Sequence, residues 1–175
     1  MVELFEILTY PNEFLKKSSR QVENIDEDIQ LIIDRMAATM YQAPGVGLAA
    51  VQVGIDLSII VYDISPKDEK PDLQVLINPV IVESNGSTVT ENEGCLSVPD
   101  LQANVKRHEF VSVDALDRHG NSVQLEAKDL LAIVLQHEID HLNGVLFIDR
   151  ISSLKRNMYK KRVKKQIKRN ERKKA

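Results

Sequence analysis

The segment that most restricts how this chain can fold is DLLAIVLQHEIDHLNG, residues 129–144, an unbroken helical pattern that carries two histidines four positions apart. Asp129 stands where a helix cap is favoured, and Gly144 stands where helices commonly end. A helix advances by about 100° per residue, so His141 lies about 40° from His137 around its surface. Two imidazoles on one face can bind one metal ion. The remaining chain must then fold so that a further ligand reaches this helix.

A glutamate, Glu138, directly follows the first histidine and favours a catalytic metal site over two unrelated histidines. Glu138 lies about 100° from His137 around the helix, so it flanks the expected ion and can touch a water molecule there. The competing interpretation is an ordinary helix with two surface or core histidines. A zinc peptidase is a further alternative, but in the pattern H-E-x-x-H-x-x-G-x-x-H the third histidine is replaced here by Phe147.

The third ligand is expected to come from earlier in the chain. After His141 there is no further His or Cys, and only two acidic residues follow. His119 falls in a predicted turn and His108 follows two basic residues, whereas Cys95 in NEGCLSVP offers a thiolate, which is a good metal ligand. An inert buried thiol and a nucleophile paired with a histidine remain alternatives for Cys95. A purely structural metal would need a fourth protein ligand, and no fourth candidate stands out.

Hydrophobic periodicity predicts an α+β fold, because one helix precedes several short strands and two helices follow them. Residues 27–41 have apolar positions at helical spacing, with Asp26 or Asp28 as a cap. Apolar and β-branched runs predict strands at residues 57–63, 74–84, 87–91, 108–116 and 121–127, with a hairpin turn at 118–120. We expect the last helix to dock near its start and to fray at its end. Its thin apolar stripe comprises Leu154, Met158, Val163 and Ile167.

The charge of the chain is strongly divided. Residues 1–154 hold 11 Lys and Arg against 25 Asp and Glu, a net charge of −14, whereas residues 155–175 hold 12 basic residues against one acidic residue, a net charge of +11. A basic tail on an acidic body often marks a contact with nucleic acid. The competing interpretation is a solvated helix that keeps the protein in solution.

Other features limit where the protein works. No apolar run approaches the roughly 18 residues of a membrane span, and the first residues do not look like a signal or transit peptide. We therefore expect no membrane association. The only cysteine, Cys95, excludes an intramolecular disulfide and fits a reducing cytoplasm. GVGLAA, residues 45–50, also matches a dinucleotide fingerprint with Asp63 downstream, but the helix precedes the glycines and the strand follows them, so we expect no nucleotide cofactor.

Three segments in this order resemble the signature motifs of peptide deformylase: GVGLAAVQVG (45–54), EGCLS (93–97) and QHEIDHLNG (136–144). In that family, water activated by a metal removes the formyl group from the initiator methionine of new bacterial polypeptides. The resemblance covers roughly residues 1–150, and Val51 departs from the proline of many members. It implies an α+β fold in which small mixed antiparallel sheets pack around a central metal-binding helix, with N-terminal and C-terminal helices.

The resemblance also implies chemical roles. The metal ligands would be Cys95, His137 and His141, with the fourth position left to water. Ferrous iron is the native metal of the family, and Zn²⁺, Ni²⁺ or Co²⁺ suit the same ligands. Glu138 would carry a proton from the attacking water to the leaving amine. The amide of Gln52 and the backbone N–H of Leu96 would hold the charge that builds on the formyl oxygen.

The substrate is expected to bind beside this helix. Gly45 and Gly47 would let the backbone approach an extended peptide. Three apolar residues share the helix face of the histidines and could form a methionine pocket, although they could equally be core: Leu130, Ile133 and Val134. Val46 and Leu96 are expected to complete that pocket. Asp140 is expected either to orient a ligand or to lie on a solvated helix face.

The basic C-terminal helix resembles that of the Gram-negative-type branch of the family. This likeness implies that the tail docks on ribosomal RNA, where formylated chains emerge. We therefore expect a catalytic domain over residues 1–150 and a basic tail over residues 151–175. The expected partners are a formyl-methionyl nascent peptide and the ribosome, in a bacterial cytoplasm.

Overall fold

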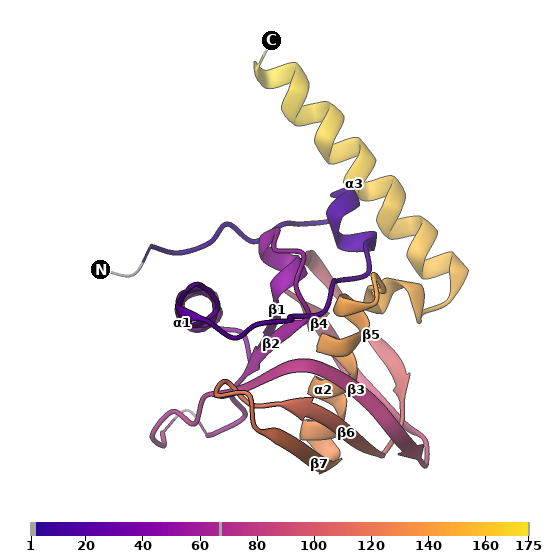
Figure 1. Cartoon of the computed structure of the whole chain (residues 1–175). Coiled ribbons are helices and arrows are strands. Elements are labelled where there is room, and N and C mark those ends of the chain that lie inside the picture. The colour runs from indigo at the N-terminus through magenta and orange to yellow at the C-terminus, as the bar shows by residue number, and fades with distance from the viewer. Residues whose placement is uncertain (1–2, 67, 175) are drawn as a thin grey trace.

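The computed structural model describes residues 3–66 and 68–174, and it confirms the predicted α+β class (Figure 1). The strands are β1 (Gly47–Ala49), β2 (Ile59–Tyr62), β3 (Gln74–Asn85), β4 (Thr88–Cys95), β5 (Val98–Arg107), β6 (Phe110–Leu116) and β7 (Ser122–Lys128). The α-helices are α1 (Glu27–Gln42), α2 (Asp129–Leu142) and α3 (Ser153–Lys174). A five-stranded antiparallel sheet has the order β1-β2-β3-β6-β7, and β4 pairs with β5 in a second sheet.

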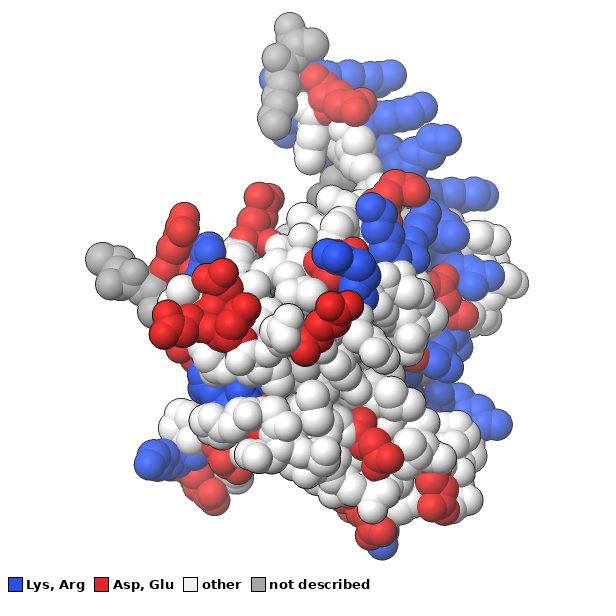
Figure 2. Space-filling view, viewed as in Figure 1, with Lys and Arg blue, Asp and Glu red and all other residues white. Residues whose placement is uncertain are grey.

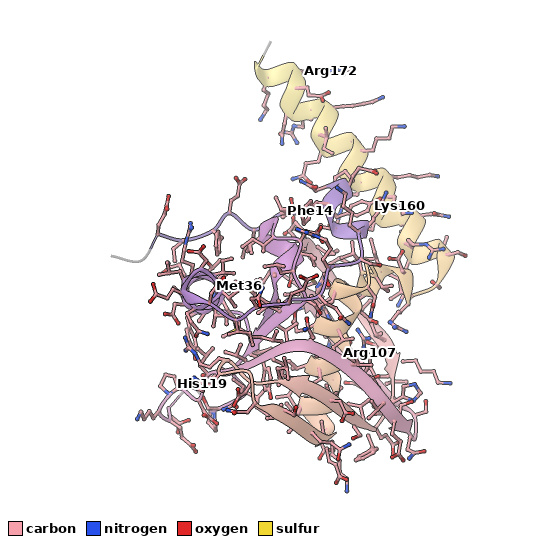
Figure 3. The ribbon with its side chains drawn as sticks, in the orientation of Figure 1. Phe14, Met36, Arg107, His119, Lys160 and Arg172 are labelled. Carbon is pink, nitrogen blue, oxygen red and sulfur yellow. The ribbon has the colours of Figure 1, made fainter. Side chains whose placement is uncertain are left out.

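Helix α1 forms where the apolar spacing predicted it. The side chain of Asp26 accepts a hydrogen bond from the N–H of Ile29 at 3.0 Å, which satisfies an otherwise free donor of the first turn. The buried face of the helix packs against β1 and β2. Met36 lies on this face (Figure 3). α1 therefore covers the first strands of the larger sheet, next to the glycine-rich segment that follows it.

Helix α2 runs through the interior between the two sheets (Figure 1). Every residue from Val134 to Leu142 is buried, so this half of the helix has protein on all sides. Asp129 does not cap it, contrary to the prediction, because β7 leads into α2 without a loop. Lys128 is the cap residue, and Asp129 makes the sharp turn from strand to helix with φ 51°.

Gly144 ends α2 and is held by a close backbone contact. Its φ is 71°, and the N–H of Val145 donates to the carbonyl of Asp140 at 2.9 Å, as in a helix-terminating turn. A Cβ on Gly144 would lie only 2.3 Å from the carbonyl oxygen of Lys16. The helix end and the N-terminal segment therefore meet at a position that only glycine fits.

Gly144→Ala is expected to lower the free energy of unfolding by more than about 2 kcal/mol, because it combines a left-handed backbone with a clash against backbone atoms. Gly120→Ala is the matched control: Gly120 has φ 85°, but its nearest neighbour would be Cδ1 of Ile25 at 3.5 Å. That variant should lose only about 1 kcal/mol of conformational strain. Urea unfolding of both variants measures the difference, and equal losses would show that the contact with Lys16 is unimportant.

Two strands were not predicted from the sequence. β1 has three residues in the glycine-rich segment, too few to give a pattern. β5 is irregular: Asp100 has φ 60°, and the pairing of β4 with β5 shifts register twice. Its last residue, Arg107, is buried although its charge is typical of an exposed position. The predicted hairpin turn is confirmed, since the N–H of Gly120 donates to the carbonyl of Asp117 at 3.1 Å.

Helix α3 docks through Tyr159 and through only part of the predicted apolar stripe. Tyr159 is buried and donates a hydrogen bond to the carbonyl of Pro99 at 3.0 Å, and Val163 packs beside it. Leu154 and Met158 are 70% and 64% exposed. Helical periodicity alone could not predict which of these residues would meet the body. The helix continues to Lys174, and its outer half extends past the body (Figure 1). Over the described residues, no helix combines the length and apolar character that crossing a bilayer requires.

Candidate metal centre

The three predicted metal ligands meet in the structure. Cys95 ends β4, and His137 and His141 lie one turn apart on α2. The Sγ atom of Cys95 is 3.1 Å from Nε2 of His141, which is 3.2 Å from Nε2 of His137. One ligand atom from each side chain lies within 4.8 Å of the others. His108 and His119 are not part of this group, and His119 lies at the β6–β7 hairpin (Figure 3).

A buried carboxylate fixes the orientation of the first histidine. Nδ1 of His137 lies 2.7 Å from Oε1 of Glu93, so this bond holds Nε2 toward Cys95 and His141. Burial alone would raise the pKa of Glu93, but the hydrogen bonds from His137 and Arg107 outweigh it and hold the pKa at about 2. Glu93 therefore remains a carboxylate. The prediction missed this role, although Glu93 is the first residue of the EGCLS segment.

Gln52 faces the thiol in one fixed orientation. It lies on a short 3-10 helix (Ala50–Val53), where its Oε1 accepts a hydrogen bond from the N–H of Ala49 at 2.8 Å. Its Nε2 donates to Oγ of Ser97 at 3.1 Å and lies 3.7 Å from Sγ of Cys95. The N–H of Ser97 also points to this sulfur, at 3.4 Å. The sulfur of Cys95 is therefore approached by two N–H donors, one from Gln52 and one from Ser97. Ser97 was not predicted as part of the site.

Glu138 is buried beside the ligands without being one of them. Burial raises its pKa to about 7, and its Oε2 has no hydrogen-bond partner among the described residues. Gly47 leaves the space for this side chain, because a Cβ there would lie 2.5 Å from Oε1 of Glu138. The prediction assigned Gly47 to backbone approach by a substrate. The structure shows a second reason for glycine at this position: any side chain there would collide with Glu138.

An open cleft of about 740 Å³ leads to these residues. Its walls include Gln52, Leu96 and Glu138 together with every residue predicted to bind substrate: Gly45, Val46, Gly47, Leu130, Ile133 and Val134. Val46 and Leu130 are half exposed at the mouth, whereas Val134 is buried. The predicted residues therefore line one apolar-walled space beside the thiol and imidazoles.

Asp140 does not lie on a solvated helix face, which was one of its two expected positions. It is buried rather than solvated, and it contacts no ligand directly. Its carboxylate instead accepts hydrogen bonds from Arg107 at 2.6 Å and from Arg150 at 2.5 and 2.6 Å. Arg107 lies in the interior beside α2 (Figure 3).

The donor set suits a divalent transition metal. One thiolate and two imidazoles are the ligands that Zn²⁺, Fe²⁺ and related ions accept, whereas Mg²⁺ and Ca²⁺ prefer oxygen. Two buried polar atoms next to these donors, Nδ1 of His141 and Oε2 of Glu138, lack hydrogen-bond partners within residues 3–66 and 68–174. Converging ligands beside unpaired polar atoms fit a metal centre, and they do not select one metal.

Comparisons with known proteins agree with this geometry. A family model described as polypeptide deformylase matches residues 4–157. A peptide deformylase from Desulfosudis oleivorans is 52% identical over 165 residues, which cover 94% of this chain and 95% of that protein.

Solved structures give the same result. The crystal structure of a peptide deformylase from Legionella pneumophila has a TM-score of 0.88 and 45% identity, covering 97% of this chain and 99% of that chain. The class I type b peptide deformylase from Acinetobacter baumannii with bound Met-Ala-Ser has a TM-score of 0.81 and 34% identity, covering 86% and 100% of the two chains. The chain therefore belongs to the peptide deformylase family, the hydrolases that remove the N-formyl group from newly made polypeptides.

Proposed function

We propose that Cys95, His137 and His141 hold one ferrous ion with which the chain hydrolyses the formyl amide of formyl-methionyl peptides. The observation that carries this proposal is the convergence of the three ligands beside the unpaired carboxylate of Glu138. Zn²⁺, Ni²⁺ and Co²⁺ suit the same donors. When bound, such an ion supplies a Lewis acid for the formyl carbonyl and an activated water molecule.

Glu138 is the proposed proton carrier. It accepts a proton as water attacks the formyl carbon, and it returns the proton to the amine when the C–N bond breaks. The products are formate and a free methionine amine. A pKa of about 7 supports both halves of this task, because the group can then bind and release a proton near neutral pH.

The formyl oxygen gains negative charge during the attack, and two donors are proposed to stabilise it. One is Nε2 of Gln52, whose orientation is supported by the hydrogen bond that its Oε1 accepts from Ala49. The other is the backbone N–H of Leu96, which lies in the tight turn between β4 and β5. A preorganised donor of this kind contributes roughly 3 kcal/mol to transition-state stabilisation.

The methionine side chain is proposed to enter the apolar part of the cleft. Helix α2 contributes Leu130, Ile133 and Val134 to this part of the cleft. The segment before β1 contributes Val46, and the turn between β4 and β5 contributes Leu96. The peptide would lie extended along the glycine-rich segment, with Gly45 and Gly47 beside its backbone. The Acinetobacter relative with bound Met-Ala-Ser supports a substrate that begins with methionine.

The decisive experiment measures metal content and formate release on protein purified without oxygen. We expect one iron per chain and release of formate from formyl-Met-Ala-Ser, with no cleavage of Met-Ala-Ser or other unformylated peptides. Cleavage of unformylated peptides without formate release would favour a zinc peptidase. Formate release by metal-free protein would refute the proposed metal site.

We also propose that residues 1–150 form the catalytic domain and residues 151–175 a tail that docks on ribosomal RNA in the bacterial cytoplasm. The charge of the tail supports this, since the residues from 155 onward carry 12 basic side chains against one acidic side chain. In Figure 2 the Lys and Arg side chains gather along α3, while acidic side chains are spread over the body. Lys160 and Arg172 extend from α3 away from the body (Figure 3).

Deleting residues 160–175 is expected to leave hydrolysis of a short formyl peptide nearly unchanged, because the cleft and Tyr159 remain. It should sharply weaken co-sedimentation with ribosomes at low salt, since binding to RNA phosphates depends on counterion release. A matched variant keeps the helix length but replaces lysines with glutamine at positions 160, 161, 164 and 165. It should bind ribosomes less tightly and with a shallower salt dependence. Equal ribosome binding by all three proteins would favour the solvated-helix interpretation.

A further inference from the structure

A chain of buried charges leads away from the candidate metal centre. Glu93 on β4 accepts hydrogen bonds from His137 at 2.7 Å and from Nε and Nη2 of Arg107 at 3.1 and 2.5 Å. Nη1 of Arg107, at the end of β5, donates to Asp140 on α2 at 2.6 Å. Asp140 also accepts two hydrogen bonds from Arg150, at 2.6 and 2.5 Å. Four charged side chains thus connect His137 to the segment that leads into α3.

Three of these four charges, on Glu93, Arg107 and Asp140, are largely removed from water. The side chains of Arg107 and Glu93 are 1% and 5% exposed, and two guanidinium groups balance two carboxylates. A buried ion pair has little stability advantage over apolar side chains of similar volume, because both charges lose their hydration. Stability alone therefore does not explain the ionic chain. Apolar side chains could not hold the carboxylate of Glu93, which contacts His137, in a fixed direction.

The fork of Arg107 supplies that direction. It donates to both oxygens of Glu93, and a two-point contact of this kind fixes the plane of the carboxylate. Oε1 of Glu93 is then aimed at Nδ1 of His137, and Nε2 of the same ring lies 3.2 Å from Nε2 of His141. A lysine in place of Arg107 would keep the charge but would lose the two parallel donors.

We propose that Arg107 is a positioning residue for His137, acting through Glu93, and that Asp140 and Arg150 hold the other arm of its guanidinium. The inference rests on the proposed function, since it takes His137 as a metal ligand. Loss of a carboxylate partner from a ligating histidine typically weakens metal binding by about 10- to 100-fold. Loss of Arg107, which orients that partner, should weaken binding within the same range.

The test uses full-length, metal-free protein and Co²⁺ as the probe. Co²⁺ affinity is measured by competition with a coloured chelator, and the visible spectrum of the Co²⁺ form reports ligand geometry. Arg107→Met and Arg107→Lys are each expected to bind Co²⁺ about 10- to 100-fold more weakly and with a changed spectrum. The matched control is Arg118→Met, which removes a surface ion pair with Asp34 and should leave both readouts unchanged.

A double variant shows whether Arg107 acts through Glu93. Glu93→Gln alone should weaken Co²⁺ binding, and adding Arg107→Met should weaken it little further, because residues that act in series are not additive. Losses that simply add would mean that Arg107 affects the centre by another route, and they would overturn the proposal. This double variant also avoids an unpaired buried carboxylate, so it remains informative if Arg107→Met alone does not fold.

Arg150→Met gives a milder test, because the side chain of Arg150 is 43% exposed and its loss should not prevent folding. A few-fold weaker Co²⁺ affinity is expected. Unchanged affinity and spectrum in folded Arg107→Lys and Arg150→Met would overturn the positioning role. Failure of the proposed function has a different signature: the unaltered protein would bind no Co²⁺, or Cys95→Ser would leave its Co²⁺ spectrum unchanged.

Discussion

Glu138→Gln is expected to keep one metal ion per chain and to lower kcat for formyl-Met-Ala-Ser by at least about 100-fold. A loss of this size is what removal of a general acid–base residue usually causes. Glutamine has the same shape but cannot carry the proton. The change removes a group that acts in the transition state, so kcat and kcat/KM should fall together. Metal analysis with initial-rate formate assays measures both effects.

Two further variants sharpen this result. Glu126→Gln alters an exposed glutamate on β7 and should retain full activity. Gly47→Ala places a methyl group 2.5 Å from the position of Oε1 of Glu138, so it should lower kcat by displacing the carboxylate without removing it. Near-normal formate release by Glu138→Gln would exclude Glu138 from the mechanism.

Cys95→Ser is expected to weaken metal binding by more than about 100-fold, because it removes a direct ligand rather than a partner of one. Activity should fall with metal content. A thiolate beside ferrous iron should also be sensitive to oxidation, so the iron-loaded protein should lose activity in air and the nickel-loaded protein should keep it longer. Metal titration and timed assays in air and under argon measure these differences.

The alternative role for Cys95, a nucleophile, gives the opposite pattern. Chelators would then leave activity intact, while alkylation of the metal-free protein would abolish it. Under the metal interpretation, chelation inactivates the protein and added Fe²⁺, Ni²⁺ or Co²⁺ restores it. The two treatments therefore separate the two interpretations of Cys95.

Local geometry explains what the sequence could predict. The spacing of His137 and His141 fixes their relative direction on any helix, so their shared face was evident without a tertiary structure. The apolar period of residues 27–41 and the cap at Asp26 are equally local, and both are confirmed in α1. The chemistry of a thiolate and the family resemblance predict Cys95 as the third ligand, and the structure brings its sulfur to the histidines.

Packing between elements decided the rest. Arg107 and Asp140 have charges that are typical of a surface, yet they are buried because each finds its counter-charge on another element. Gly47 has to lack a side chain because Glu138 of α2 occupies that space in the folded chain. Tyr159 and Val163 of α3 face the body while Leu154 and Met158 do not, because the partners of the docked face, such as Pro99, lie on another element.

Spacing and motif order were therefore enough to predict the shared histidine face of α2, the α+β class and the family. Long-range packing brings Glu93 to His137 and Arg107 to Glu93. It also decided which face of α3 docks. A helical period acts over a few residues, whereas the contact between Cys95 and His141 joins positions 46 residues apart. Such contacts depend on how the buried faces of separate elements fit together.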